Sequence, residues 1–423
     1  MTSLADLGSL DLAPGERVHV VFDPRALSGL HLPSALALPK RDLRESIPAG
    51  KGRIDAAEYL ARVRRGQLSG MQSMMRLIDA HPGATVCIVG GGPTLQDNVG
   101  ELRRLAKRGA IIIGVNKSHD WLLKRGLPCH YAMLLDPKEW VADYITLDIS
   151  RETIQRAGKL WVEPRYLIAS QCHDKTIEKF RTHPRAYLYH AGAGLGESKM
   201  LREEFPAPCE WVNVPGASVS GLRAAFIAHG LGGRDLHLFG IDGSSKPPTE
   251  PEARAIYAAL VEAGMVKAGD ASYDDILGML FELARRRNKL PEAVSDILKR
   301  HHYSYAKPHI DVTWCGFTVD LNTGWSRNFM ANHHMSRAVY EFEDSMKDWD
   351  RLIRKGKLDP FRLRVHGDPE VSAIAMVAAG MGVHFDVEQN EKYGKPPKEK
   401  RDAEHAEETC DEWPEAHQES AAG

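Results

Sequence analysis

Short apolar runs alternate with amphipathic stretches through the middle of the chain. Residues 85–89 (TVCIV) form a continuous apolar run, which is typical of a parallel strand buried on both faces. The same pattern predicts strands at residues 17–22, 110–115, 131–135, 159–162, 186–189, 236–239 and 361–366. Helical spacing of apolar residues predicts helices at residues 55–81, 95–107, 118–125, 219–229, 325–355 and 371–379. This alternation predicts an α/β fold with a doubly wound, mostly parallel, Rossmann-like sheet.

Composition along the chain suggests five segments. We interpret residues 1–80 as an N-terminal arm of a strand plus a helix, and residues 81–250 as the Rossmann-like core. Residues 251–300 show helical patterns and are expected to form a helical insertion or lid, after which residues 301–387 complete the core. Residues 388–423 are polar and highly charged, which is typical of a disordered tail.

Charge and cysteine usage limit the classes of function. The 423 residues are 43% hydrophobic and 26% charged, which is ordinary globular composition, and the formal net charge is −2. A chain with no overall positive charge is not expected to attract nucleic acid or an anionic membrane surface. The basic stretch 285–289 (RRRNK) is the only indication of nucleic acid, and a solvated helix face explains it more simply. Six scattered cysteines without a CxxC pair favour reduced thiols.

The N-terminal sequence predicts a cytoplasmic protein. Residues 1–16 lack the basic region and the apolar run of a secretory signal. No apolar stretch approaches the roughly 20 residues that span a bilayer. The expected partners are therefore small molecules, while the sequence leaves the oligomeric state open.

A glycine-rich turn follows the strand predicted at residues 85–89. Gly90, Gly91 and Gly92 precede Pro93 and Thr94, and the next residues have helical periodicity. Glycines let a backbone approach a phosphate closely, and a helix start offers unpaired N–H groups. The turn is neither the GxGxxG fingerprint nor a Walker A loop, because Leu95 replaces the third glycine and no Gly-Lys-Ser/Thr follows. A nucleotide-binding turn and a ligand-free tight turn both remain open.

Three polar residues follow other predicted strands. Asn116 ends the strand at 110–115, and its amide can donate to and accept from a sugar or base. Asp136 and Asp242 follow the strands at 131–135 and 236–239, where a carboxylate could hold a ribose hydroxyl or Mg²⁺. The alternatives are a turn-forming asparagine, a helix-capping Asp136 and an Asp242 that the turn needs for its backbone. Their shared sheet edge favours a common site.

A second anion site is predicted at the start of the helix at 219–229. Ser218, Ser220 and Gly221 place hydroxyls and a flexible backbone near a helix N-terminus. The alternative is ordinary capping by Ser218.

A histidine-tyrosine cluster follows the helical insertion. His302 suits general-base catalysis near neutral pH, and Tyr303 and Tyr305 suit contact with phosphate. The alternative is a surface loop.

In this order, the strand-end motifs resemble the MptE-like family, which is named for archaeal 6-hydroxymethylpterin diphosphokinase. The motifs are IVGGGPTL, IIIGVN, LLDP and GASVSGLRAAFIAHGLGGRDLHLFGID. They cover residues 85–242, and the resemblance resumes at residues 313–347 as a strand plus a helix. The resemblance implies a nucleotide-binding transferase that moves diphosphate from ATP to a hydroxymethyl acceptor, with Mg²⁺ bridging the phosphates. Asp136 and Asp242 are the candidate metal ligands and catalytic carboxylates.

The same blocks are similar to bacterial sialyltransferases that use a CMP-linked sugar. That resemblance implies a turn that holds phosphate, an Asn that contacts the donor, a Ser-Gly helix start near the cytidine, and a later His as general base. The implied positions are Gly90, Gly92, Thr94, Asn116, Ser218, Ser220 and Gly221, with a weaker match for His302, Tyr303 and Tyr305. The sequence departs from the pattern where Thr94 replaces the usual Ser and where residues 252–300 precede the His/Tyr cluster.

Three functions follow from these motifs. The first is a diphosphokinase-like transferase, the second is a glycosyltransferase with a CMP-linked donor, and the third is a non-catalytic nucleotide-binding module. Metal dependence separates the first two, because Mg²⁺-dependent ATP binding favours the diphosphokinase and activity in EDTA favours the glycosyltransferase. Binding without turnover would favour the third.

Overall fold

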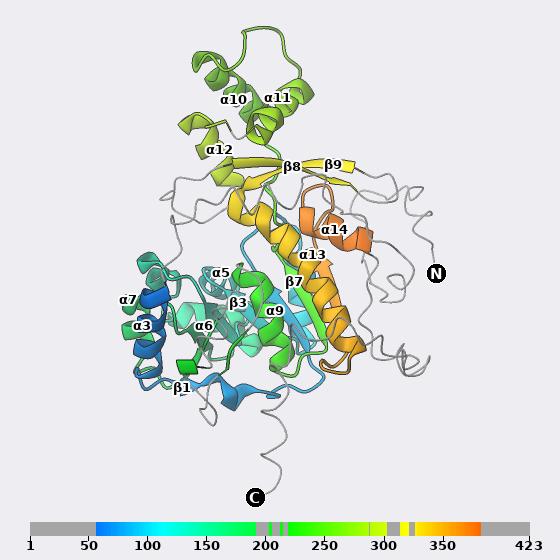
Figure 1. Cartoon of the computed structure of the whole chain (residues 1–423). Helices are drawn as coiled ribbons and strands as arrows, with labels where there is room; N and C mark the ends of the chain where they lie inside the picture. Colours follow the sequence, from blue (N-terminus) through cyan, green and yellow to red (C-terminus); the bar gives the residue numbers. More distant parts are fainter. Residues whose placement is uncertain are drawn as a thin grey trace, which may run out of the picture.

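The computed structural model describes residues 56–191, 203–204, 212–214, 219–286, 288–302, 314–320 and 326–381. The strand predicted at 17–22 and the tail predicted from 388 lie outside these residues. Figure 1 shows a central sheet with helices on both faces and a helical module that projects beyond one edge of the sheet.

The central sheet has eight strands, all paired in parallel, in the order β1-β6-β5-β4-β3-β2-β7-β10. Their bounds are β1 (Gln72–Ser73), β2 (Thr85–Val89), β3 (Ile111–Val115), β4 (Tyr131–Leu134), β5 (Arg165–Ala169), β6 (Ala186–Tyr189), β7 (Asp235–Phe239) and β10 (Arg362–His366). Continuous apolar runs such as TVCIV fit this arrangement because both faces of the sheet are covered. The predicted doubly wound α/β fold is confirmed.

The chain changes direction across the sheet at β2. From β2 it proceeds through β3, β4, β5 and β6 towards one edge, whereas β7 and β10 lie on the other side of β2. The strand order therefore reverses at β2, between β3 and β7. Open α/β sheets bind ligands at such a switch point, outside the carboxyl ends of the strands.

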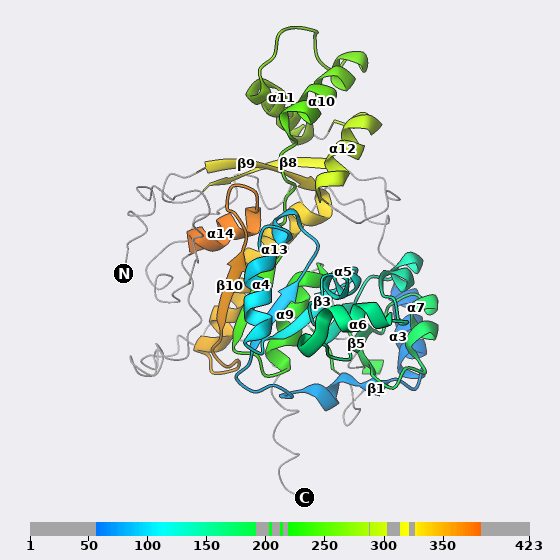
Figure 2. The same ribbon diagram turned by 180° about the vertical axis from the view of Figure 1, so that it is seen from behind.

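Helices cover the two faces of the sheet. Figure 1 shows α9 (Ser220–Gly230) and α13 (His333–Arg354) in front of the strands. Figure 2 shows α4 (Val99–Lys107) and α6 (Arg151–Ala157) on the opposite face. The remaining helices around the sheet are α3 (Ala56–Gln67), α5 (Ser118–Lys124), α7 (Asp174–Phe180) and α14 (Ala373–Met381), with 3-10 turns η2 (Met74–Leu77), η3 (Pro93–Leu95), η4 (Glu139–Tyr144) and η5 (Gly158–Leu160).

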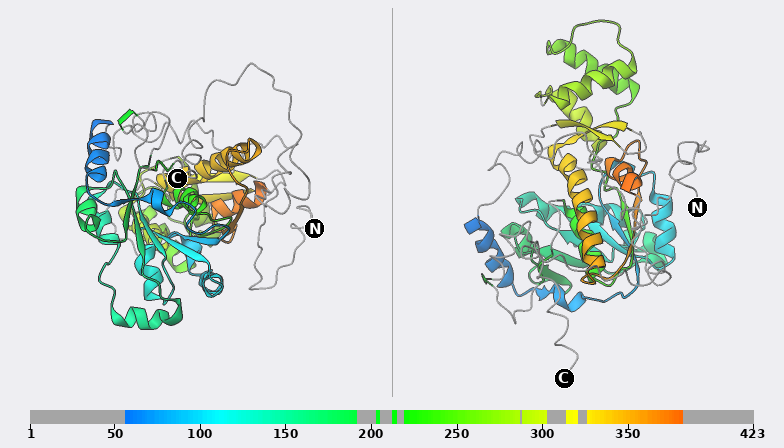
Figure 3. Two further views of the ribbon diagram at one scale, coloured as in Figure 1. Left: turned by 90° about the horizontal axis from the view of Figure 1, so that it is seen from below. Right: turned by 45° about the vertical axis from the view of Figure 1, so that its right-hand side comes forward.

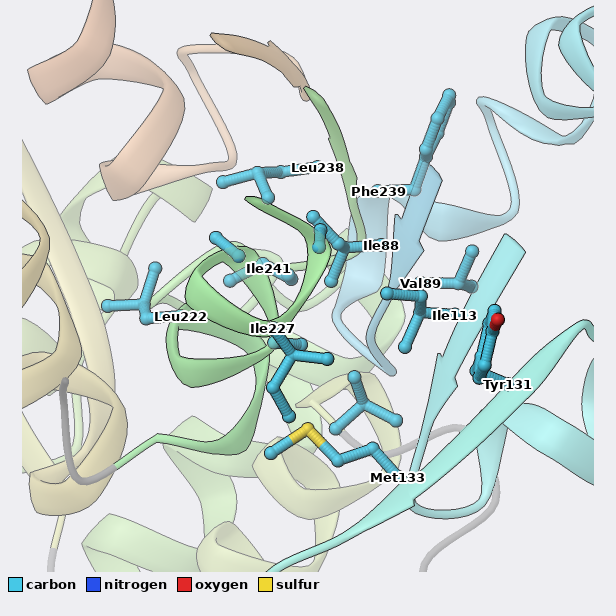
Figure 4. Packing of buried hydrophobic residues seen from close by; sticks show 14 of the residues in the cluster. Ile88, Val89, Ile113, Tyr131, Met133, Leu222, Ile227, Leu238, Phe239 and Ile241 are labelled. Atoms are coloured by element: carbon cyan, nitrogen blue, oxygen red, sulfur yellow. The ribbon is translucent and has the colours of Figure 1, made fainter. Parts of the chain in front are cut away.

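One apolar core joins the strands to the helices. Figure 4 shows Ile227 of α9 facing Ile88, Ile113 and Met133 of the strands, and all four are at most 1% exposed. Burial of an aliphatic side chain contributes about 1.5–3 kcal/mol, so this layer fixes α9 on the sheet. The start of α9 is thereby held at the carboxyl edge of the strands.

A separate helical module stands beyond the carboxyl edge. It contains α10 (Glu250–Glu262), α11 (Tyr273–Arg285) and α12 (Glu292–His302), which share an apolar cluster of their own. A ribbon of β8 (Trp314–Asp320) and β9 (Ser326–Asn332), paired antiparallel, lies between the module and the sheet (Figure 3, right). The Ser245 amide donates to the Met330 carbonyl at 2.7 Å and ties this ribbon to the segment after β7.

Three predicted elements differ from the structure. The helix predicted at 55–81 ends at Gln67, because Gly70 adopts a φ of +82° and β1 and η2 follow. The strand predicted at 159–162 is wrong, since η5 occupies this region and the strand is β5, which begins after Pro164. The helix predicted at 325–355 begins only after β9, where the Asn332 side chain accepts from the Met335 amide and caps α13.

The structure contains no membrane-crossing helix among the residues that it describes, because none of these helices is both long and apolar enough.

Two histidines with lowered pKa values make the fold sensitive to acid. Burial lowers the pKa of His190 to about 4, and burial together with nearby His81 and Arg165 lowers the pKa of His130 to about 4. A histidine in the unfolded chain titrates near pH 6.5, so the unfolded state binds more protons between pH 6.5 and pH 4. Stability that is complete above pH 6.5 is therefore lost as the pH falls through this window.

We expect urea denaturation to show a decrease in the free energy of unfolding of up to roughly 3 kcal/mol per histidine between pH 7 and pH 4. The variant His190→Gln should reduce the slope of this decrease. An unchanged free energy between pH 7 and pH 5 would contradict the assignment of neutral buried histidines.

Candidate functional site

The glycine-rich turn after β2 packs against the turn after β7. The Gly90 amide donates to the Phe239 carbonyl at 2.8 Å, and the Gly92 amide donates to the Gly240 carbonyl at 2.7 Å. A Cβ at Gly90 would lie 2.5 Å from the Gly240 carbonyl oxygen, and a Cβ at Gly92 would overlap the Asp242 carboxylate. The glycines at 90 and 92 are therefore required by contact between two neighbouring loops.

Asp242 and Thr94 lock these two loops together. Thr94 donates to Asp242 twice, from its amide to Oδ2 at 3.0 Å and from its hydroxyl to Oδ1 at 2.7 Å. Both side chains are buried, with Thr94 1% exposed and Asp242 3% exposed. The Asp242 carbonyl accepts from the Ile374 amide at 3.0 Å, which adds α14 to the same junction. Asp242 thus joins the loops after β2, β7 and β10.

Burial dominates the electrostatics of Asp242. It raises the pKa of this carboxyl, although the hydrogen bonds from Thr94 oppose the change. Because both carboxylate oxygens already accept hydrogen bonds from Thr94, the carboxylate is directed into the protein. The predicted roles of Asp242 in catalysis and metal binding would require these bonds to break.

Asn116 lies directly after β3 and beside the glycine-rich turn. Its backbone adopts a φ of +54°, in the left-handed region that Asn tolerates better than most residues. Its Oδ1 atom is buried and has no hydrogen-bond donor in the described part of the chain. The Ser118 hydroxyl donates to the Gly90 carbonyl at 2.7 Å and fastens this loop to the turn. An unpaired buried oxygen on a strained backbone is the pattern expected of a ligand-binding residue.

Asp136 and a lysine-aromatic pair lie at the end of the next strand. Asp136 Oδ1 accepts from the Lys138 amide at 3.1 Å, and burial raises the pKa of this carboxyl. Burial and the nearby Asp136 charge raise the pKa of Tyr144, and Lys117 Nζ lies 4.7 Å from the Tyr144 ring centre. The ends of β3 and β4 therefore combine cationic, acidic and aromatic groups.

The start of α9 reaches the same edge of the sheet. Ser220 is the first residue of this 11-residue helix. A Cβ at Gly221 would lie 2.8 Å from Ile241 Cδ1, so Gly221 allows the helix to approach the loop after β7. Helix N-termini carry a partial positive charge that stabilises anions. Ser218 lies outside the described residues.

The histidine-tyrosine cluster belongs to a different layer. His302 is the last residue of α12 in the helical module, and Tyr303 and Tyr305 lie outside the described residues. The basic stretch nearby has ordinary ion pairs, because Arg285 and Arg286 both contact Glu282.

The two predicted metal ligands follow strands that are not neighbours. Asp136 follows β4 and Asp242 follows β7, with β3 and β2 between them. At about 4.8 Å per strand, the two strand ends are about 14 Å apart. Mg²⁺ binds its oxygen ligands at about 2 Å, so the two carboxylates could share one ion only if their loops brought them together across this separation. No group of three or more His, Cys, Asp or Glu residues with metal-binding geometry occurs within the described ranges.

One polar residue of this edge was missed in the sequence. Gln171 follows β5, is 8% exposed, and has a buried Oε1 atom without a donor among the described residues. Its Nε2 atom donates to the Ala191 carbonyl at 3.5 Å. The sequence did not point to Gln171. The strand was predicted at residues 159–162 and not at 165–169, so Gln171 did not stand at the end of a predicted strand.

Comparisons with known proteins support the sequence resemblance. Residues 65–246 match the MptE-like family, described as "6-hydroxymethylpterin diphosphokinase MptE-like". No curated protein gives a significant match. The solved structure of MAf glycosyltransferase from Magnetospirillum magneticum AMB-1 aligns at 17% identity with a TM-score of 0.34, covering 58% of this chain and 34% of that protein.

The chain thus spans about a third of the length of that glycosyltransferase. The family match contains β2, β3, β4, β5, β6 and β7, and with them the turn at Gly90–Gly92, Asn116 and Asp136. Over residues 65–246 the chain therefore matches the MptE-like family, as its glycine-rich turn and strand-end motifs predict.

Proposed function

We propose that the protein is a nucleotide-binding transferase of the MptE-like type, which transfers diphosphate from ATP to a hydroxymethyl acceptor. The observation that carries this proposal is the family match, because it contains the strand ends at the switch point of the sheet. Asn116, Asp136 and the start of α9 are the groups at this edge that are best suited to a ligand.

The phosphates would lie between the glycine-rich turn and the start of α9. The Gly90 and Gly92 amides are used within the protein, so these glycines would act by shaping the turn. Thr94 is buried and donates its hydroxyl to Asp242, so it would act by holding the turn in place. The N-terminus of α9, with Ser220 and Gly221, would supply positive potential to the phosphates.

The reaction needs little covalent chemistry from the protein. The acceptor hydroxyl oxygen would attack the β-phosphorus of ATP and lose its proton to solvent, while the bond from the β-phosphorus to the oxygen shared with the α-phosphate breaks and AMP leaves with that oxygen. Catalysis of such a transfer consists mainly of positioning and charge neutralisation. Lys117 follows β3 and Lys138 follows β4, so both would add positive charge at this edge of the sheet.

Mg²⁺ usually binds phosphates together with one or two carboxylates. Among the described residues, Asp136 is the carboxylate suited to this role. Asp242 is held by Thr94, and the strands β3 and β2 lie between the two carboxylates. The ion would supply charge neutralisation on the diphosphate. Asp136→Asn should then weaken the Mg²⁺ dependence of ATP binding.

Calorimetry with ATP, CMP and CTP tests nucleotide binding by the full chain, with Mg²⁺ or with EDTA. We expect Mg²⁺-dependent binding of ATP, and formation of AMP and a diphosphorylated product when 6-hydroxymethylpterin is added. Release of CMP from a CMP-linked sugar in EDTA would instead establish the glycosyltransferase. Nucleotide binding without turnover of any acceptor would establish a non-catalytic module, and absence of nucleotide binding would refute all three functions.

A further inference from the structure

We propose that the ends of β3, β4 and β5 form a subsite in which Asn116, Asp136 and Gln171 accept hydrogen bonds from a ligand group with several N–H or O–H donors. This subsite rests on the proposed function, because it would hold the part of the substrate that is not the nucleotide. It adds Gln171 to the site and gives Asp136 a role in recognition.

The three residues share an unused capacity to accept hydrogen bonds. Asn116 Oδ1 and Gln171 Oε1 are buried and lack a donor within the residues that the structure describes. Asp136 uses Oδ1 to accept from the Lys138 amide, and its Oδ2 has no donor in the same part of the chain. A buried acceptor without a partner costs about 1–3 kcal/mol, so a ligand that supplies donors recovers this free energy.

Topology brings the three acceptors to one edge. β3 pairs with β4, and β4 pairs with β5, so Asn116, Asp136 and Gln171 follow three neighbouring strands. At about 4.8 Å between strands, the three positions span roughly 10 Å, which suits one ring system or one sugar.

Hydrogen bonds hold the elements around these acceptors in place. Helix α3 covers this end of the sheet, because Arg62 donates to the Pro137 carbonyl at 2.8 Å and Tyr59 donates to the Ala191 carbonyl at 3.4 Å. The Gln171 amide group is oriented by the Ala191 carbonyl, which leaves Oε1 as the free end.

Two kinds of ligand supply these donors. A pterin ring presents N–H groups from its amino-pyrimidinone, and a nucleotide-linked sugar presents hydroxyls. Both chemistries pair with amide and carboxylate oxygens. The subsite requires donors, so a purely apolar or purely phosphorylated group would leave the acceptors unpaired.

The test uses the full chain and two variants matched to the local structure. Asn116→Gly removes the amide while keeping a residue that adopts the φ of +54° without strain. Gln171→Met keeps the length of the side chain and removes both polar atoms. Gln155→Met on the exposed surface of α6 is the control, and Asn116→Asp retains an acceptor oxygen.

Calorimetry would compare 6-hydroxymethylpterin, a CMP-linked sugar, CMP and ATP. We expect the wild type to bind either 6-hydroxymethylpterin or the CMP-linked sugar. We expect Asn116→Gly and Gln171→Met each to weaken the binding of that ligand about tenfold. Binding of CMP and ATP by Gln171→Met should be unchanged, Gln155→Met should match the wild type, and Asn116→Asp should retain affinity.

Three results would overturn the subsite: neither donor-bearing ligand binds, both variants bind it with wild-type affinity, or CMP and ATP weaken by the same factor. Thermal unfolding confirms that each variant is folded, and Gln171→Met alone tests the subsite if Asn116→Gly does not fold. The proposed function fails separately, when the wild type binds no nucleotide.

Discussion

Replacing Gly92 with valine is expected to prevent stable folding. The Cβ of any residue at this position would overlap the Asp242 carboxylate and would lie 2.8 Å from the Gly240 carbonyl oxygen. The Asp242 carboxylate and the Gly240 carbonyl both accept buried hydrogen bonds, so neither group can move away without breaking them. Overpacking costs about 1–3 kcal/mol and a lost buried hydrogen bond costs a similar amount. Gly92→Ala should therefore reduce the free energy of unfolding by about 3 kcal/mol, and Gly92→Val by more.

Gly100→Ala is the matched control for this experiment. Gly100 lies in α4, and a Cβ there would have nothing within 4 Å. Removing a helical glycine should stabilise the protein by about 0.5–1 kcal/mol. Urea denaturation measures all three variants, and a Gly92→Val protein as stable as the wild type would show that the two loops separate easily.

Loss of the Asp242 carboxylate is expected to destabilise the same junction. Asp242→Ala removes the acceptor for the amide and hydroxyl of Thr94, which leaves the buried amide unpaired and the hydroxyl with only a long contact of 3.5 Å to the His366 carbonyl. We expect a loss of about 3–4 kcal/mol in the free energy of unfolding. Thr94→Val removes only the hydroxyl and should cost about 1–2 kcal/mol.

A double-mutant cycle separates the pair from its surroundings. Combining Asp242→Ala with Thr94→Val should cost less than the sum of the single variants, since the hydroxyl bond is lost only once. Asp148→Ala, at an exposed position, should change stability by less than about 0.5 kcal/mol. Additive costs for the pair would contradict a direct contact in the folded protein.

Local patterns predicted the strands that are buried on both faces. Residues 85–89 and 186–189 coincide with β2 and β6, because continuous apolar runs and flanking turn residues are local signals. β5 and β9 were missed. The run RYLIA follows Pro164 and the apolar residues 160–162, which were predicted as the strand instead, and SRNFMAN resembles the start of the helix that follows it.

The sequence predicted where the candidate site lies better than it predicted what each residue does there. Strand ends at 116, 136 and 242 were identified because parallel strands bring their loops to one edge. The role of Asp242 depends on Thr94, which is 148 residues away in the chain, and no local pattern contains that contact. The structural role of Gly90 and Gly92 could not be predicted for the same reason, because the atoms that crowd them belong to the loop after β7.

The position of β10 in the sheet bears on how the protein is synthesised. β10 pairs with β7 along five residues, yet it lies more than a hundred residues further along the chain. A nascent chain that has emerged only as far as the helical module would present β7 as an open edge, and open edges invite pairing with other chains. The segment that matches the MptE-like family ends at residue 246, so β7 gains its outer neighbour β10 only when the C-terminal part of the protein arrives. Expression of that segment alone would therefore yield an incomplete sheet prone to self-association.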